Sequence, residues 1–444
     1  MAKFKEIIEH YLFVIGLLSL GIVLWALGLG HIATLPLGLY ALAIFVFCDD
    51  PKNVFVPLLS VAFLLNSFKD SSVYVFYIIA GSMFVIGAIF FLIKMLAVKK
   101  VKVQKGKMFY AMIAYTVAVC LGGLIGYFNP VVSLILFGFC LVIYFCYFIL
   151  LNFAKNLKDA VRWYFIIASV QILVQLILSH AGSNFWWSLA HRNIADIGVQ
   201  NINVASIYVL LGMLSALWLA YENKKQDIWF GLAGFAQYLV IFFLYSRMTT
   251  LIATLALLGC GIWIFVKSNH KKTIGFVAFG IVAMASVCAL VFWEDFNTLI
   301  WSYTARLAGG NGREVLWPWC FEKFKSNPWF GVGFVSSEPV PYVTTPSVIM
   351  AHNTILQYLT STGIIGTLIM MYFFFVKYKT VLNGFKKFEV FSALMVFGVA
   401  LIGITDQSQS IDIFMITISL GLVALCEILN KQSSEQTMLG ENLN

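Results

Sequence analysis

The sequence predicts an all-α, polytopic transmembrane helix bundle, and three properties of the chain support this prediction. Of its 444 residues, 61% are hydrophobic and only 11% are charged, whereas charged residues make up about 25% of a soluble domain. The mean hydropathy is +0.91. The apolar residues form long continuous runs and do not alternate with polar ones, so they fit membrane helices and not the strands of a barrel.

About fourteen apolar runs are candidates for membrane helices, and we expect about 12–14 spans because the third run is short. Lys3 and Lys5 precede the first run, which is longer than the apolar part of a signal peptide, so we interpret it as a retained span. We treat residues 1–444 as a single integral membrane domain. In order, the runs cover residues 11–30, 32–48, 53–66, 72–97, 108–127, 131–151, 163–180, 204–220, 228–245, 249–266, 273–293, 354–376, 388–404 and 411–430.

The basic residues predict the orientation of these spans. With both termini in the cytoplasm, most of the 29 lysines and arginines fall on the cytoplasmic side, as the positive-inside rule requires. We therefore expect a multi-pass protein of the cytoplasmic (inner) membrane. Its net charge of +9 would face anionic membrane lipids, and no nucleic acid partner is needed to explain it.

Arginine departs from this rule, because all arginines but one fall on the outer side. The planar guanidinium can bind phosphate through two parallel hydrogen bonds. The placement therefore suggests phosphate binding, while chance or anchoring of a long side chain at the membrane surface remains the alternative explanation. The outward arginines are Arg192, Arg247, Arg306 and Arg313.

Two outward loops are long, at residues 180–203 and 294–353, and long ordered loops are usually functional. We predict that 294–353 is an extracytoplasmic catalytic loop; it holds five of the nine prolines. Within it, residues 314–325 are predicted to form a short helix that ends before Pro328, followed by a flexible turn at Gly331 and Gly333. Its tryptophans either anchor the helix at the membrane interface or stack on sugar rings.

The eight cysteines give no indication of a redox or metal site. They form no CxxC pair, and no cluster of histidine and cysteine has the spacing of metal ligands. We interpret the cysteines as small apolar side chains of the helix packing. No metal and no cofactor are expected.

Several short motifs follow one another between residues 190 and 370, and their order and outward placement make the set more specific than any one of them. Together they resemble the O-antigen ligase and O-antigen polymerase superfamily. One departure is that Ile202-Asn203 stands where the family often has Pro-Asn. The motifs are Asn203 with Ala205, Ser246-Arg247, Gly312-Arg313-Glu314 with Trp317, Asn327-Pro328 with Gly331-Val332-Gly333-Phe334, and His352-Asn353 with Leu356, Leu359, Gly363 and Gly366.

The resemblance implies an inverting, metal-independent glycosyltransferase that uses a glycan linked to undecaprenyl pyrophosphate outside the cytoplasmic membrane. It implies that His352 is the catalytic base and that Arg313 is catalytic and binds the pyrophosphate. Arg247 and Arg192 would also bind the pyrophosphate. Weaker substrate contacts are implied for Asn203, Asn353 and Trp317.

The chemistry of these residues fits the implied roles. Negative charge grows on the pyrophosphate as the sugar bond breaks, and arginines can stabilise it. His352 directly precedes a span for which Asn353 is a suitable N-cap. The positive end of that helix favours the neutral imidazole that a general base requires. A polar residue at the membrane interface is the alternative interpretation of His352.

We expect that the enzyme polymerises lipid-linked repeat units of a surface polysaccharide, namely O-antigen, capsule or exopolysaccharide. The alternative is an O-antigen ligase that transfers the glycan to lipid A core or another acceptor. A flippase for lipid-linked oligosaccharides is a weaker third hypothesis, because the spans carry almost no charge and one outward loop is long. Partners would be the lipid-linked glycan, membrane lipids, a flippase and a chain-length regulator.

Overall fold

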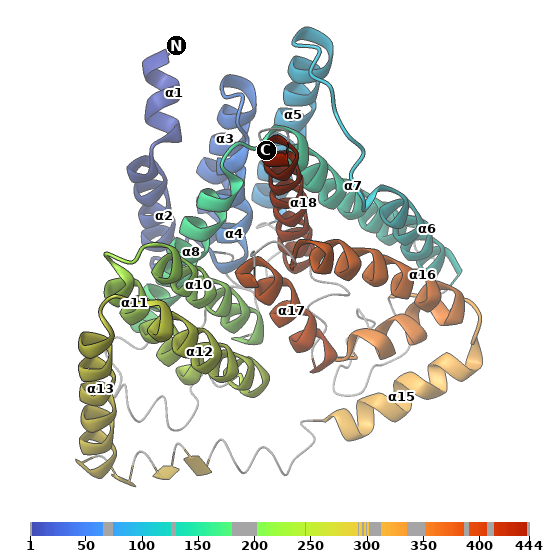
Figure 1. The fold of residues 1–444 in the computed structure, drawn as a ribbon. Coiled ribbons are helices and arrows are strands. Elements are labelled where there is room, and N and C mark those ends of the chain that lie inside the picture. The colour runs from blue at the N-terminus through green and yellow to red at the C-terminus, as the bar shows by residue number, and fades with distance from the viewer. Residues whose placement is uncertain are drawn as a thin grey trace. The chain divides into compact units, whose positions relative to one another are not determined.

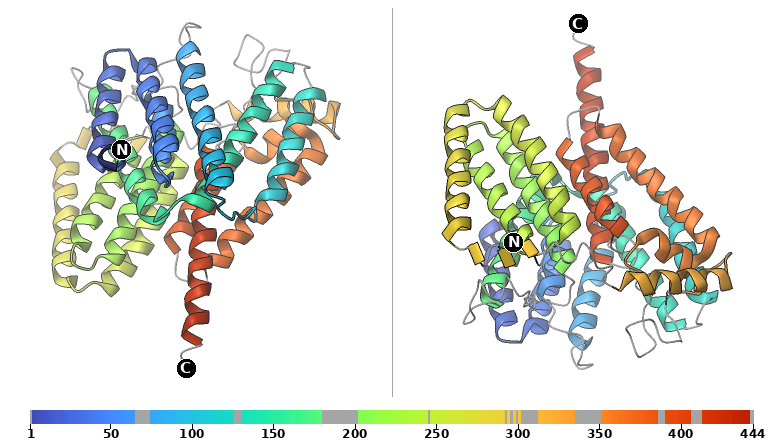
Figure 2. Two further views of the ribbon diagram at one scale, coloured as in Figure 1. Left: turned by 90° about the horizontal axis from the view of Figure 1, so that it is seen from above. Right: turned by 90° about the horizontal axis from the view of Figure 1, so that it is seen from below.

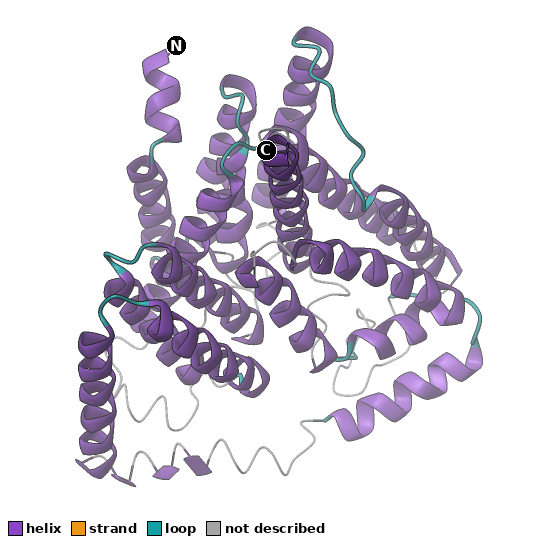
Figure 3. Cartoon of the chain, viewed as in Figure 1, coloured by secondary structure: helices purple, strands orange, loops and turns teal. Residues whose placement is uncertain are grey.

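The computed structural model describes residues 2–64, 74–125, 130–179, 202–244, 246–291, 293–294, 297–298, 300–301, 312–334, 351–385, 390–405 and 413–441. All regular secondary structure within these ranges is helical, as Figure 3 shows. The predicted all-α class is therefore confirmed.

The described helices form a multi-pass membrane protein. Eight of them are long and apolar enough to cross a membrane, or nine if the bent pair Lys3–Glu9 and Tyr11–Ala26 forms one span. Further apolar helices of 10–17 residues account for several of the remaining predicted spans. The sequence led us to expect about 12–14 spans, and the difference arises because these helices are shorter than the apolar runs that contain them. The shorter helices cover Lys52–Val61, Phe109–Leu121, Asp227–Phe243 and Val390–Gly403.

Contacts within the chain group the helices into two compact units. The first unit contains Met1–Lys94 and Lys155–Gly309. In it, α10 is buried along almost its whole length and packs against α8, α11 and α12 (Figures 1 and 2). Its elements are α1 (Ala2–Glu9), α2 (Tyr11–Ala26), α3 (Gly30–Phe47), η1 (Lys52–Val54), α4 (Phe55–Leu64), α5 (Tyr74–Ile93), α8 (Leu157–Ser179), α10 (Ile202–Glu222), α11 (Asp227–Phe243), α12 (Arg247–Lys267) and α13 (Lys271–Val291).

The second unit contains Met95–Ala154 and Gly310–Asn444. Its central element is α16, which packs against α6, α15, α17 and α18. A short π-helix, η3 (Lys94–Val98), precedes it after α5. The helices of the second unit are α6 (Phe109–Ile125), α7 (Pro130–Phe153), α15 (Arg313–Ser326), α16 (Thr354–Phe385), α17 (Val390–Thr405) and α18 (Ile413–Glu441).

The short helix predicted inside the long loop is present as α15. It begins after Gly312, whose φ of 80° is in the left-handed region that glycine adopts without strain. The amide of Gly312 donates to Glu314 Oε1 at 3.2 Å. On its inner side α15 buries Leu316 and Cys320 against Ala351. Burial raises the pKa of the Cys320 thiol to about 11, so this cysteine is an apolar packing group, as expected.

The long helix α16 is broken at Gly363, where φ is 64° and ψ is −164°. A break interrupts the helical hydrogen bonds and leaves carbonyl groups that need other donors. The glycine motif after α15 supplies them. The amide of Val332 donates to Thr360 O at 2.8 Å, and that of Gly333 donates to Ser361 O at 3.0 Å.

The bonding is reciprocal, because the amide of Ile364 donates to Pro328 O at 2.8 Å. Glycine makes this approach possible: a Cβ on Gly331 would lie 2.4 Å from the carbonyl carbon of Ser361, and one on Gly363 would lie 2.4 Å from that of Trp329. The expectation of a flexible turn at Gly331 is therefore wrong. The turn is fixed by backbone hydrogen bonds, which the sequence did not reveal.

We predict that Gly331→Ala and Gly363→Ala each destabilise the protein. Both positions have positive φ, at 74° and 64°, which costs a residue other than glycine about 1–3 kcal/mol, and the close backbone contact adds to that cost. The measurement is thermal unfolding of the purified protein in detergent. Gly81→Ala is the matched control, because a Cβ there meets nothing within 4 Å. Equal unfolding temperatures for all three variants would contradict the role of the two glycines.

Candidate functional site

His352 is held in an uncommon backbone conformation at the entrance to α16. Its φ is 48°, in the left-handed region, which residues other than glycine seldom adopt. Both polar groups of the preceding residue are bonded: Ala351 N donates to Gln357 Oε1 at 2.9 Å, and Ala351 O accepts from Trp317 Nε1 at 2.9 Å. These bonds fix the main chain at the point where the His352 side chain leaves it.

Asn353, on the other side of His352, is the N-cap of α16. Its Oδ1 accepts from the amide of Leu356 at 3.0 Å, and its carbonyl accepts from the amide of Gln357 at 2.9 Å. The predicted N-cap is therefore confirmed. Thr354 then fixes the helix start to α17, because its hydroxyl donates to Gly403 O at 2.7 Å.

Arg313 is the first residue of α15, and Trp317 follows about one turn later. The bond from the Trp317 indole to Ala351 connects this helix directly to the chain beside His352. Trp317 remains partly exposed, at 39%. It therefore has a structural contact that neither of the two sequence interpretations, interfacial anchoring and sugar stacking, included.

Arg247 and Asn203 belong to the first unit, where the N-terminal ends of α12 and α10 are joined. The Ser206 hydroxyl lies 2.6 Å from Asn203 O and 2.9 Å from Thr249 Oγ1. Thr249 Oγ1 in turn lies 2.9 Å from Ser246 Oγ. These hydroxyl groups are buried, so two of the predicted motifs lie at one end of the first unit.

Arg247 and Arg313 share a placement that is electrostatically unfavourable. Each is the first residue of its helix, at the positive end of the helix dipole, where a cation costs about 0.3–1 kcal/mol. Neither N-cap residue makes a side-chain hydrogen bond to the helix amides: Ser246 bonds to Thr249 Oγ1 instead, and Gly312 has no side chain. A bound anion would reverse this cost, since helix amides and guanidinium groups both attract it.

The structure does not bring all predicted site residues together. Arg313, Trp317, His352 and Asn353 lie in the second unit, whereas Arg247 and Asn203 lie in the first. Arg192 lies outside the described residues, as do residues 302–311 and 335–350 of the predicted catalytic loop.

Gln357 is a residue of this region that sequence reasoning missed. It is fully buried, and its side chain contacts two places: Oε1 accepts from Ala351 N, and Nε2 donates to Ser361 Oγ at 2.9 Å. It therefore links the chain before His352 to the break at Gly363. The available signal was a glutamine one turn into an apolar run, which requires hydrogen-bond partners in a membrane helix.

The fold and these residues define a class of protein: a multi-pass, all-helical membrane protein with basic and imidazole side chains at the starts of α12, α15 and α16. Comparison with known families narrows the class. Residues 231–371 match the family model described as O-Antigen ligase, which confirms the resemblance to the O-antigen ligase and polymerase superfamily. The matched range includes Arg247, Arg313 and His352. No curated protein matches the chain.

We predict that Asn353→Ala destabilises the start of α16. Loss of an N-cap costs about 0.5–2 kcal/mol, and Leu356 N would lose its acceptor. Asn353→Ser is the matched control, because serine also caps helices, and it should retain most of the stability. Thermal unfolding of both variants in detergent checks the prediction. Equal destabilisation by alanine and serine would show that capping is not what Asn353 contributes.

Proposed function

We propose that the protein is a glycosyltransferase that polymerises oligosaccharide repeat units linked to undecaprenyl pyrophosphate into a surface polysaccharide. The family match supports a ligase or polymerase type of function. The observation that carries the proposal is the junction at His352. An imidazole on a fixed left-handed backbone is bonded, through Ala351 and Trp317, to the helix that begins with Arg313.

In the proposed reaction, His352 accepts the proton of an acceptor sugar hydroxyl. The hydroxyl oxygen then forms the new bond to the anomeric carbon as the bond from that carbon to the pyrophosphate breaks, with inversion of configuration. The electron pair of the broken bond goes to the leaving pyrophosphate. Arg313 stabilises this growing charge, and the fixed backbone of His352 keeps the base in place before the substrate arrives.

Arg247 is proposed to bind pyrophosphate as well, because it has the same helix-start placement as Arg313. Arg192 and Asn203 keep the roles that the family resemblance implies, as does Asn353 in addition to its capping bond. We propose that no metal takes part, since the arginines supply the positive charge that a metal would provide. The reaction is proposed to occur outside the cytoplasmic membrane, with a flippase delivering the donor and a chain-length regulator as a partner.

A ligase is the second candidate function, and the description of the matched family favours it. A ligase would use the same donor but would transfer the finished glycan to lipid A core or another acceptor. The two candidates differ in the acceptor alone. Purified protein with lipid-linked repeat units as the single glycan should give a ladder of products if it is a polymerase. Product that forms only after lipid A core is added would identify a ligase.

We predict that His352→Asn abolishes this activity, with a loss of about 10²–10⁴-fold expected when a general base is removed. Asparagine tolerates the left-handed conformation, so the variant keeps the backbone and removes the base. The ladder assay is run with EDTA present, and unfolding temperature serves as the control for folding. Full activity of this variant would exclude His352 as the base. Loss of wild-type activity in EDTA would contradict a metal-independent reaction.

We predict that Arg247→Lys and Arg313→Lys each lower kcat/KM for the donor by at least about tenfold. Lysine keeps the charge and loses the paired hydrogen bonds to phosphate. The measurement is the initial rate at varied donor concentration. Arg306→Lys is the matched control, because Arg306 belongs to none of the motifs, and its rate should not change. An equal effect at all three arginines would indicate a general effect of surface charge and not a site.

A further inference from the structure

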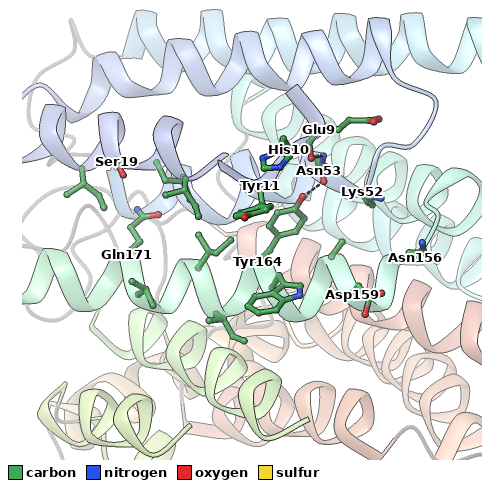
Figure 4. A pocket seen from close by; sticks show the side chains of 18 of the residues that line it. Glu9, His10, Tyr11, Ser19, Lys52, Asn53, Asn156, Asp159, Tyr164 and Gln171 are labelled. Atoms are coloured by element: carbon green, nitrogen blue, oxygen red, sulfur yellow. Dashed lines mark hydrogen bonds between the residues drawn. The ribbon is translucent and has the colours of Figure 1, made fainter. Parts of the chain in front are cut away.

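The first unit contains a cavity of about 1010 Å³ that none of the motifs accounts for. It lies along α2 and α8, and residues before and within η1 border one end (Figure 4). The buried side chains of Leu18 and Tyr164 form its floor. Its edges are exposed, with Tyr11 at 61% and Trp163 at 46%. It is therefore a groove that opens to the surroundings of the helices.

The open end of this groove is held by a bend of 56° between Lys3–Glu9 and Tyr11–Ala26. Two bonds fix the bend: Tyr40 Oη donates to Ile8 O at 3.1 Å, and Asn53 Nδ2 donates to Glu9 O at 3.3 Å. The Tyr164 hydroxyl donates to Asn53 Oδ1 (Figure 4). Because Asn53 bonds to both α1 and α8, the opening is part of the folded architecture.

The long walls of the groove are apolar. The walls along α2 extend from Tyr11 to Ile22, which is roughly 16 Å at the rise of an α-helix. That length is about half of the roughly 30 Å hydrocarbon core of a bilayer. The groove therefore has the length of one membrane leaflet and suits an acyl chain, not a molecule that spans the membrane. The apolar residues of the walls are Ile15 and Ile22 on α2 and Ile166, Ile167, Val170 and Val174 on α8.

The open end carries charged groups of both signs. Glu9, His10, Lys52 and Asp159 all border it (Figure 4). The two carboxylates can accept hydrogen bonds from an ammonium group, and Lys52 can pair with a phosphate. A headgroup with negative charge alone would be repelled by both carboxylates. A zwitterionic headgroup that has an ammonium group next to its phosphate matches this arrangement.

We propose that this groove binds a membrane phosphatidylethanolamine, with one acyl chain along α2 and α8 and the headgroup at Glu9, Lys52 and Asp159. The positive-inside rule places Lys52 on the cytoplasmic side. The polyprenyl donor has its pyrophosphate on the outer side in the proposed reaction, so it would lie in the opposite direction. The lipid is thus distinct from the donor, and this inference does not rest on the proposed function.

The test uses the full-length protein in mild detergent with equal amounts of phosphatidylethanolamine and phosphatidylglycerol that have identical acyl chains. Native mass spectrometry counts the retained lipids. We expect one retained phosphatidylethanolamine. Val170→Trp fills the groove and should lower its occupancy at least about tenfold. Val117→Trp in α6 is the matched control, because Val117 and Val170 are 49% and 48% exposed, and it should have no effect.

A second variant tests the headgroup. Glu9→Gln should reduce the preference for phosphatidylethanolamine over phosphatidylglycerol while the total amount of bound lipid stays the same. Three results would each overturn the proposal: equal retention of both lipids by the unmodified protein, no retained lipid, or equal losses in Val170→Trp and Val117→Trp.

Discussion

The second unit depends on one contact between two stretches of main chain, where Gly331 meets Gly363. A membrane helix cannot be interrupted without leaving polar backbone groups in an apolar environment. Here the interruption of α16 is compensated because Val332 and Gly333 donate to the carbonyl groups of Thr360 and Ser361. Only glycine at both positions permits the approach. The break, the turn after α15 and the position of α15 against α16 therefore form one structural unit.

This contact explains how a loop residue can be placed as accurately as a residue in a helix. The chain before His352 is bonded to Trp317 of α15 and to Gln357 of α16, and the contact between the glycines holds these two helices together. Preorganisation of this kind is what general base catalysis requires. The cost is a left-handed backbone at His352, and conformations of this kind are concentrated at functional sites.

Charge is distributed in the chain according to two different requirements. Lysine follows the requirement of membrane orientation, and it lies where the positive-inside rule expects it. Arg247 and Arg313 instead begin helices, where their charge opposes the helix dipole. The groove along α2 and α8 shows a third pattern, with acidic and basic groups together at the end of an apolar channel. Each pattern matches a different ligand: anionic leaflet lipids, a pyrophosphate, and a zwitterionic headgroup.

The sequence by itself determined the membrane class, the short helix around Arg313, the N-cap at Asn353 and the superfamily. These features depend on composition, on local hydrogen bonding and on short motifs, which are all legible along the chain. Tertiary structure alone decided the roles of Gly331, Gly363, Gln357 and Trp317. Each of these residues acts through a partner that is distant in sequence, or through a backbone approach for which a glycine gives no direction. A bare glycine is compatible with a flexible turn or a fixed contact, and only the partner on the other chain segment distinguishes the two.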